Sequence, residues 1–210
     1  MDADSFLATV REAKATELDR LGSEKALLAT TDAVLETAAV LRATAAAERR
    51  AAETAERWAD DEPDERVRAA FADVAVRERD HYEQVLDGLD EAAVAADTDA
   101  LHEHLRDLDG TIPRVAAGLV GRPLASARTL LQVVNFFVNE ADEQTADRFR
   151  ALRSDTEALA EEGAALLVDC CDSDDDWATA TAAATRAVDV AYAEYVETLD
   201  GMGVDPKPIC

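Results

Sequence analysis

Residues 48–81 read ERRAAETAERWADDEPDERVRAAFADVAVRERDH, and their pattern is the strongest indication of the fold in this sequence. The acidic turn 60–64 separates two segments of helical periodicity, and Pro63 stands where a second helix can begin. One face of the first segment carries Leu41, Ala45, Glu48, Ala52, Ala55 and Ala59. The matching face of the second carries Val67, Phe71, Val74, Ala75, Glu78, His81, Tyr82, Val85 and Leu89. This pattern predicts an antiparallel helical hairpin.

Three polar side chains interrupt these two apolar faces. Glu48 is the charged residue of the first face, while Glu78 and His81 are neighbours on the second because they are three residues apart. Glu48 precedes Pro63 by as many residues as Glu78 follows it, so the hairpin places both carboxylates at one depth, roughly 20 Å from the turn. The pattern predicts that the three side chains converge inside the protein.

A carboxylate buried without a partner costs several kcal/mol, so this group must be paired, protonated or bound to a metal. Two glutamates and a histidine are suitable ligands for iron or manganese, and we therefore expect Glu48, Glu78 and His81 to bind Fe or Mn. Two other interpretations stay open. A buried ion pair can form with Arg42, Arg49 or Arg77, or the helices can be less well buried than the pattern suggests.

The composition favours one folded, all-helical and strongly acidic domain. The 210 residues include 8 glycines and 5 prolines, and the formal net charge is -25. The lysines are Lys14, Lys25 and Lys207, and many carboxylates with little lysine are typical of adaptation to a cytoplasm of high salt. We expect no secretory signal, no membrane span, a cytoplasmic location and no nucleic-acid surface, which would need clustered Lys and Arg. Whether the chain forms a homo-oligomer stays open.

The other segments are assigned from periodicity and from capping residues. We expect a helix over 4–21 that ends at Gly22, a short helix over 23–31 capped by Ser23, and a linker over 90–98. Thr98 and Asp99 cap a short helix that ends at Gly110, while Pro113 and Pro123 each open a further helix. The run 139–142 is either a turn or part of a helix. Later helices reach about residue 171 and run over 177–199.

These assignments give a single domain over 1–210 with five parts. The expected parts are an N-terminal helix and turn over 1–31, a first hairpin over 32–89, short connecting helices over 90–121, a second helical set over 122–201 and an extended tail over 202–210. His102 and His104 lie in the connecting part and are expected at the surface. Cys170 and Cys171 follow a helix beside aspartates, which should raise the pKa of both thiols, and Cys210 ends the tail.

Glu48 together with Glu78-Arg79-Asp80-His81 resembles the first half-site of the rubrerythrin- and ferritin-like family. The resemblance is specific over residues 38–89, and the Pro-Lys-Pro-Ile-Cys ending is similar to halophilic archaeal proteins described as rubrerythrin-like. It implies a ferritin-like four-helix bundle in which each of two hairpins contributes one Glu and one Glu-x-x-His to a di-iron centre. It also implies oxidation of ferrous iron by oxygen or peroxide.

The sequence departs from the family pattern in its second half. No histidine follows His104, so a second Glu-x-x-His cannot form, and a cysteine knuckle for electron entry is missing too. Glu140 and Glu194 are the expected substitute carboxylates, with Glu17 as a weaker one, although each also fits a solvated flank. The resemblance implies a di-iron site, and the departure from the pattern leaves a mononuclear site, an asymmetric site or a relic that no longer binds metal as alternatives. The alternative is a non-catalytic interaction or regulatory protein, a class that includes transcription antitermination proteins.

Overall fold

The computed structural model describes residues 1–90, 92–95 and 97–207, and every regular element in this part of the chain is a helix. The all-helical prediction is therefore confirmed. No helix of the described residues is long and apolar enough to cross a membrane. In chain order the elements are α1 (Ala3–Ala13), α2 (Ala15–Leu21), α3 (Lys25–Thr30), α4 (Thr37–Asp61), α5 (Glu65–Leu86), α6 (Ala100–Arg106), α7 (Thr111–Ala116), the π-helical turn η1 (Ala117–Gly121), α8 (Arg122–Asn139), α9 (Glu143–Cys170) and α10 (Asp174–Gly201).

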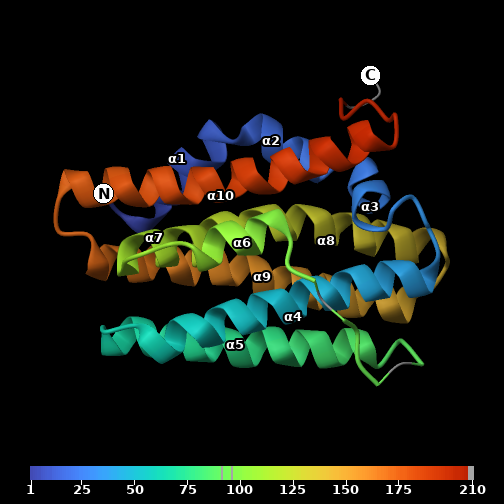
Figure 1. The fold of residues 1–210 in the computed structure, drawn as a ribbon, viewed down its shortest axis with the longest axis horizontal. Coiled ribbons are helices and arrows are strands. Elements are labelled where there is room, and N and C mark those ends of the chain that lie inside the picture. Colours follow the sequence, from blue (N-terminus) through green and yellow to red (C-terminus); the bar gives the residue numbers. More distant parts are fainter. Residues whose placement is uncertain (91, 96, 208–210) are drawn as a thin grey trace.

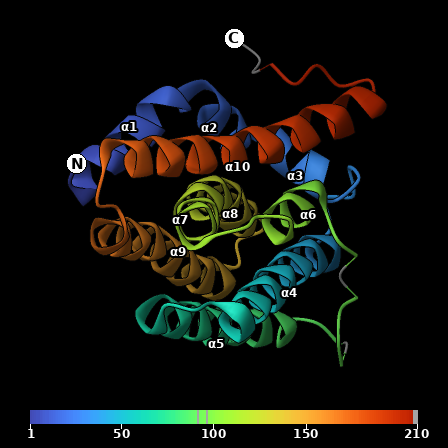
Figure 2. The ribbon, with the colours of Figure 1, turned by 60° about the vertical axis from the view of Figure 1, so that its left-hand side comes forward.

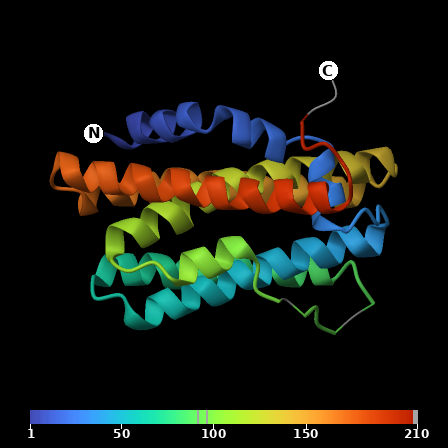
Figure 3. The same cartoon turned by 45° about the horizontal axis from the view of Figure 1, so that its top comes forward.

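Two helical hairpins and a covering helix form the framework (Figure 1). α4 packs along α5, α8 packs along α9, and α10 crosses η1, α7 and α6 on the side away from α5. Figure 2 shows α7 and α8 nearly end-on, surrounded by α4, α6, α9 and α10. Seen in Figure 3, the short helices α1 and α2 follow the outer side of α10. The segment α7–η1–α8 therefore forms the centre of the molecule.

The α4–α5 hairpin forms as the sequence predicts, because its turn is capped on both sides. The side chain of Asp64 accepts hydrogen bonds from the backbone N–H groups of Arg66 and Val67 at the start of α5. Glu62 is buried, and its Oε1 accepts a 2.7 Å hydrogen bond from the hydroxyl of Thr111. Near the turn the rings of Trp58 and Phe71 lie 5.2 Å apart and tie the two helices together. These contacts set the register in which Glu48 faces Glu78.

The central helix is continuous where the sequence predicted two separate helices. The helix predicted to open at Pro123 is α8, which has this proline in its first turn, but no break separates it from η1. The N–H of Arg122 donates to the carbonyl of Ala117, five residues back, so the chain passes through a π turn before the proline. The missing N–H of Pro123 is thereby accommodated at the junction with α8.

Two predictions for the N-terminal region are also wrong in detail. The helix predicted over 4–21 is interrupted at Lys14, whose ammonium group lies 2.6 Å from Asp189 on α10. This break lets both short helices follow the same long neighbour. Ser23 does not cap α3, because its hydroxyl lies 3.1 Å from the hydroxyl of Tyr195 and α3 begins only at Lys25.

The later boundaries agree with the sequence. Asn139 ends α8 and residues 140–142 form a turn, with Ala141 at φ 57° and Asp142 capping α9 through the N–H of Thr145. Ser173 and Asp176 form a reciprocal capping box at the start of α10. Cys210, at the end of the predicted tail, lies outside the described residues.

Candidate metal centre

Glu48, Glu78 and His81 meet inside the α4–α5 hairpin. Each offers one ligand atom, and these atoms lie within 4.8 Å of one another. All three side chains are buried, with relative exposures of 6%, 2% and 3%. The apolar stripes of the two helices therefore bring together the three residues that the sequence selected, and the group could hold a metal ion.

Two ligand atoms of this group lack a partner among the described residues. Oε2 of Glu78 and Nδ1 of His81 are buried and form no hydrogen bond. Nδ1 lies 3.7 Å from Oε2 of Glu78 and 3.7 Å from Oε2 of Glu48. These separations are too long for hydrogen bonds. Ligands at about 2.0–2.2 Å from one ion stand at comparable separations from each other, so the residues present fit a bound metal.

The other ring nitrogen of His81 faces α9. Its Nε2 lies 3.5 Å from Oδ2 of Asp155, whose side chain is 60% exposed. A carboxylate on the far nitrogen holds a proton there, so a bound metal ion would replace only the proton on the near nitrogen, which is the usual arrangement around metal-binding histidines. Asp155 was missed by the sequence analysis, because it belongs to a different helix and no short-range pattern links it to His81.

Arg122 completes the buried charge cluster. Its side chain is 7% exposed; Nη2 donates a hydrogen bond to Oε1 of Glu78, and Nε donates to the carbonyl of Gly118 at 3.3 Å. The π turn leaves that carbonyl without the N–H of Arg122, so the side chain of the same residue takes its place. The central helix therefore places the buried Arg122 next to Glu78.

The arginines that the sequence analysis considered have other partners or positions. Arg49 bonds Glu53 and the carbonyl of Val94, and Arg77 bonds Glu162. Arg42 also has an interaction. Arg122 was missed, and the signal that could have found it is a lone arginine inside the apolar run 115–125. The ion-pair alternative is therefore confirmed in kind, with a different arginine.

Burial and charge set the pKa values of the group in opposite directions. Burial and the neighbouring charge of Glu78 raise the pKa of Glu48 to about 7. Burial alone would raise the pKa of Glu78, but the charge of Arg122 and the contacts with His81 and Glu48 hold it well below its usual value. Burial lowers the pKa of His81, yet the two carboxylates outweigh it and raise that pKa to about 10.

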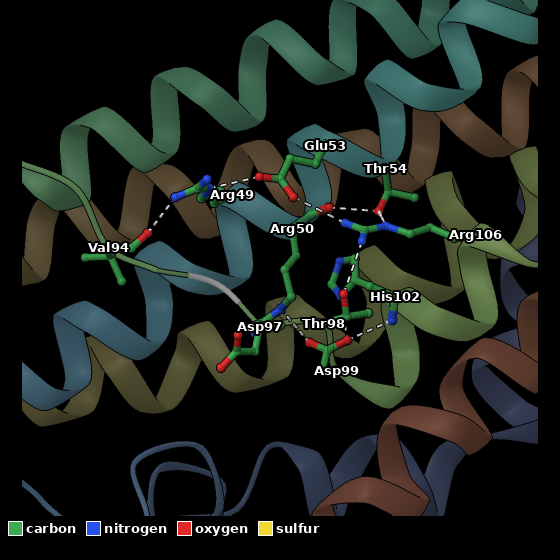
Figure 4. Close-up of polar contacts among 10 residues, drawn as sticks. All are labelled: Arg49, Arg50, Glu53, Thr54, Val94, Asp97, Thr98, Asp99, His102 and Arg106. Carbon is green, nitrogen blue, oxygen red and sulfur yellow. Dashed lines mark hydrogen bonds and ion pairs between the residues drawn. The ribbon is translucent and has the colours of Figure 1, made fainter.

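A cavity of about 510 Å³ reaches this group from the side of Glu48. It is bounded by α3, α4, α6, α8 and α10, and both Glu48 and Arg122 are among its lining residues. Figure 4 shows the polar network at its wall, where the carboxylate of Asp99 forms an ion pair with Arg50 and a hydrogen bond with His102. The cavity gives a small molecule a route towards one of the three candidate ligands.

The structure does not bring the other predicted carboxylates to the group. Glu140 is exposed at the end of α8, and Glu17 lies 4.0 Å from Lys14 at the edge of α2. Glu194 lines the cavity, where its Oε1 accepts a 3.3 Å hydrogen bond from the N–H of Ala100. The described residues therefore offer one half-site, built on α4 and α5.

The expectation that His102 lies at the surface is wrong. His102 is 4% exposed, because α6 packs against α4 and α10 and turns this side chain inwards, whereas His104 is half-buried. The expectation for the thiols is confirmed: burial, followed by nearby aspartates, raises the pKa of Cys170 and raises that of Cys171 to about 11.

The buried group carries the functional interpretation of this chain. No protein-family model, curated protein or solved structure matches this chain. The combination of two carboxylates, one imidazole, an orienting carboxylate and an adjoining cavity is typical of a metal site with an open side. The ion pair between Arg122 and Glu78 is also compatible with a buried group that only stabilises the fold.

Proposed function

We propose that this chain is a ferritin-like helical-bundle protein that binds one divalent transition-metal ion, Fe²⁺ or Mn²⁺, through Glu48, Glu78 and His81. The observation that carries the proposal is the pair of buried atoms without hydrogen-bond partners among the described residues, Oε2 of Glu78 and Nδ1 of His81. A bound cation would satisfy both at once. Carboxylate and imidazole donors suit these two metals.

Arg122 supports a single ion over a di-iron centre. Its guanidinium already holds Oε1 of Glu78, the oxygen that a second bridged ion would need. The chain also lacks a second Glu-x-x-His. With a divalent ion bound, two ionised glutamates and Arg122 leave an excess of one positive charge, which water or hydroxide from the cavity can offset.

The resemblance to rubrerythrin- and ferritin-like proteins extends the proposal to redox chemistry. Bound iron or manganese supplies one-electron redox chemistry with oxygen or peroxide. The residues of this chain would hold the ion, orient the imidazole through Asp155 and admit a small reactant past Glu48. In this proposal the metal-binding part rests on contacts, and the reaction with oxygen rests on the resemblance.

A specific observation favours a second candidate function, a helical interaction or regulatory protein without metal. The ion pair of Arg122 with Glu78 already neutralises one carboxylate, and the raised pKa of Glu48 lets the other take up a proton near neutral pH. Pairing and protonation therefore reduce the cost of burying these two carboxylates without a metal. The two functions differ in what freshly purified protein contains.

The deciding experiment measures metal content and metal affinity together. Metal-depleted protein is titrated with Mn²⁺ in air and with Fe²⁺ without oxygen, and the proposal predicts about one ion per chain. Glu78→Ala and His81→Ala should lose binding while the helical circular dichroism stays, and Glu83→Gln, an exposed change on the same helix, should keep it. Wild-type protein that takes up no metal would exclude the metal-binding function and leave the second candidate. Oxygen-dependent absorbance after addition of Fe²⁺ then tests the redox part.

A further inference from the structure

The cavity beside the buried group has the size and lining of a small-molecule site. Its volume of about 510 Å³ lies within the range of ligand pockets, and small side chains such as Ala43, Ala47 and Ala125 form much of its apolar wall. Its polar wall includes the segment before α6, α6 itself and α10, and α4 and α8 add Glu48, Arg50 and Arg122. A ligand there would touch both kinds of surface.

The positive charges of the cavity are already paired. Nε of Arg50 lies 2.7 Å from Oδ2 of Asp99, and an Nη1 hydrogen bond of 3.1 Å joins it to the carbonyl of Asp97. Arg122 is held by Glu78. An anionic ligand would have to displace a carboxylate from one of these arginines, which disfavours anions.

Two acceptors of the cavity wall, the carboxylate of Glu194 and Nε2 of His102, can still accept a hydrogen bond from a ligand. Within the described part of the chain Glu194 forms no ion pair, and burial, with the nearby charge of Asp99, raises its pKa. Nδ1 of His102 lies 2.7 Å from Oδ1 of Asp99, and the backbone N–H of His102 donates to the same oxygen. Because Asp99 is an ionised acceptor, Nδ1 carries the ring proton and Nε2 remains an acceptor.

Nε2 of His102 is buried and has no hydrogen-bond partner in the described structure. A buried acceptor without a donor costs free energy, so a ligand that donates to it gains affinity. Glu194 accepts from the first residue of α6, and His102 lies on the first turn of the same helix, so both acceptors belong to one end of the cavity.

We propose that the cavity binds a small organic cation, a primary amine with a short apolar body, whose ammonium group donates to Glu194 and His102. An ammonium has three donors and no acceptor, which complements a carboxylate and an unpaired imidazole nitrogen. The apolar body would lie against the alanine wall. This site does not require the metal, and it gives the chain a second ligand.

The test uses n-butylamine as the probe and full-length protein with a chelator in molar KCl. High salt screens the general attraction of cations to a chain of net charge -25, and the chelator keeps metal ions out of the neighbouring site. Isothermal titration should give one n-butylamine per chain, with 1-butanol and butyrate binding at least about tenfold more weakly, which is the effect of one good charged contact.

Three variants separate the cavity from the surface. Glu194→Gln should weaken n-butylamine binding about tenfold or more, whereas Glu197→Gln, the same charge change at an exposed position of α10, should not. Ala29→Phe narrows the cavity from α3 and should abolish amine binding while metal stoichiometry is unchanged. Equal effects of the two glutamate changes, preferred binding of butyrate, or no uptake of amine by the wild type would each overturn the proposal.

Discussion

Nη2 of Arg122 donates a hydrogen bond to Oε1 of Glu78, joining the first residue of α8 to the middle of α5. The side chains are 7% and 3% exposed, so neither charge has water as an alternative partner. Breaking such a pair on one side leaves an unpaired buried charge, which is more costly than removing both.

We therefore expect Arg122→Met to lower the free energy of unfolding by about 3–5 kcal/mol in the presence of a chelator. The double variant Arg122→Met with Glu78→Met should be more stable than the single variant, because no charge stays unpaired. Urea unfolding followed by circular dichroism measures both. As a control, Arg66→Met removes an exposed pair with Asp169 and should cost no more than about 1 kcal/mol. If Arg122→Met is as stable as Arg66→Met, the pair of Arg122 and Glu78 does not stabilise the fold.

Asp155 should act on metal affinity more than on folding. Its side chain is 60% exposed, yet it lies 3.5 Å from Nε2 of His81, where it would hold the remaining ring proton when a metal ion binds Nδ1. We expect Asp155→Asn to weaken Mn²⁺ binding about 10- to 100-fold, with a change in unfolding free energy within about 0.5 kcal/mol. Glu161→Gln, an exposed change on the same helix, is the matched control. If both variants bind Mn²⁺ as the wild type does, Asp155 does not orient the imidazole.

The sequence predicted the half of the site that depends on local spacing. Glu48, Glu78 and His81 lie on two regular helices joined by a capped turn, so periodicity and distance from Pro63 are enough to bring them together. Arg122 and Asp155 reach the group from distant helices, and no local rule predicts which of 21 basic residues turns inwards.

The same distinction explains the errors in the fold. A π turn depends on one hydrogen bond five residues back, and its sequence looks like two helices separated by Gly121 and Pro123. His102 was misplaced because a helix of 7 residues has no strong periodicity of its own, and packing against α10 decides which side it buries. Capping residues at long helices were reliable because their effect is local.

Close packing around the central helix predicts intolerance of an added methyl group. A Cβ at Gly163 of α9 would lie 2.6 Å from the carbonyl oxygen and 2.7 Å from Cβ of Leu119 in η1. Alanine is favoured over glycine inside a helix by about 1 kcal/mol, but a clash with backbone forces the two helices apart at a cost of typically 1–3 kcal/mol. We expect Gly163→Ala to lower the melting temperature.

Gly201→Ala is the control for this change, because a Cβ there meets nothing within 4 Å. It should leave the melting temperature unchanged or raise it slightly. Stability of Gly163→Ala equal to that of the control would mean that η1 and α9 are further apart than the structure has them.

Asp99 makes a pH dependence measurable. Burial alone would raise its pKa, but the contacts with His102 and the charge of Arg50 lower it from 3.8 to about 2. The unfolded chain therefore takes up a proton at this carboxyl before the folded chain does. The resulting stability is fully present above about pH 4 and is lost as the pH falls towards 2, and a shift of this size corresponds to about 2 kcal/mol.

Asp99→Asn removes that contribution, so the wild type should exceed the variant in unfolding free energy by about 2 kcal/mol at pH 6 and by clearly less at pH 3. Urea unfolding at both pH values measures the difference, and subtraction cancels the carboxylates common to the two chains. Asp97→Asn makes the same change of charge in the same segment, at an exposed position, and controls for total charge. A gap between wild type and Asp99→Asn that stayed constant from pH 6 to pH 3 would show that His102 and Arg50 do not stabilise the ionised form, and the polar wall of the cavity would then need a different protonation state.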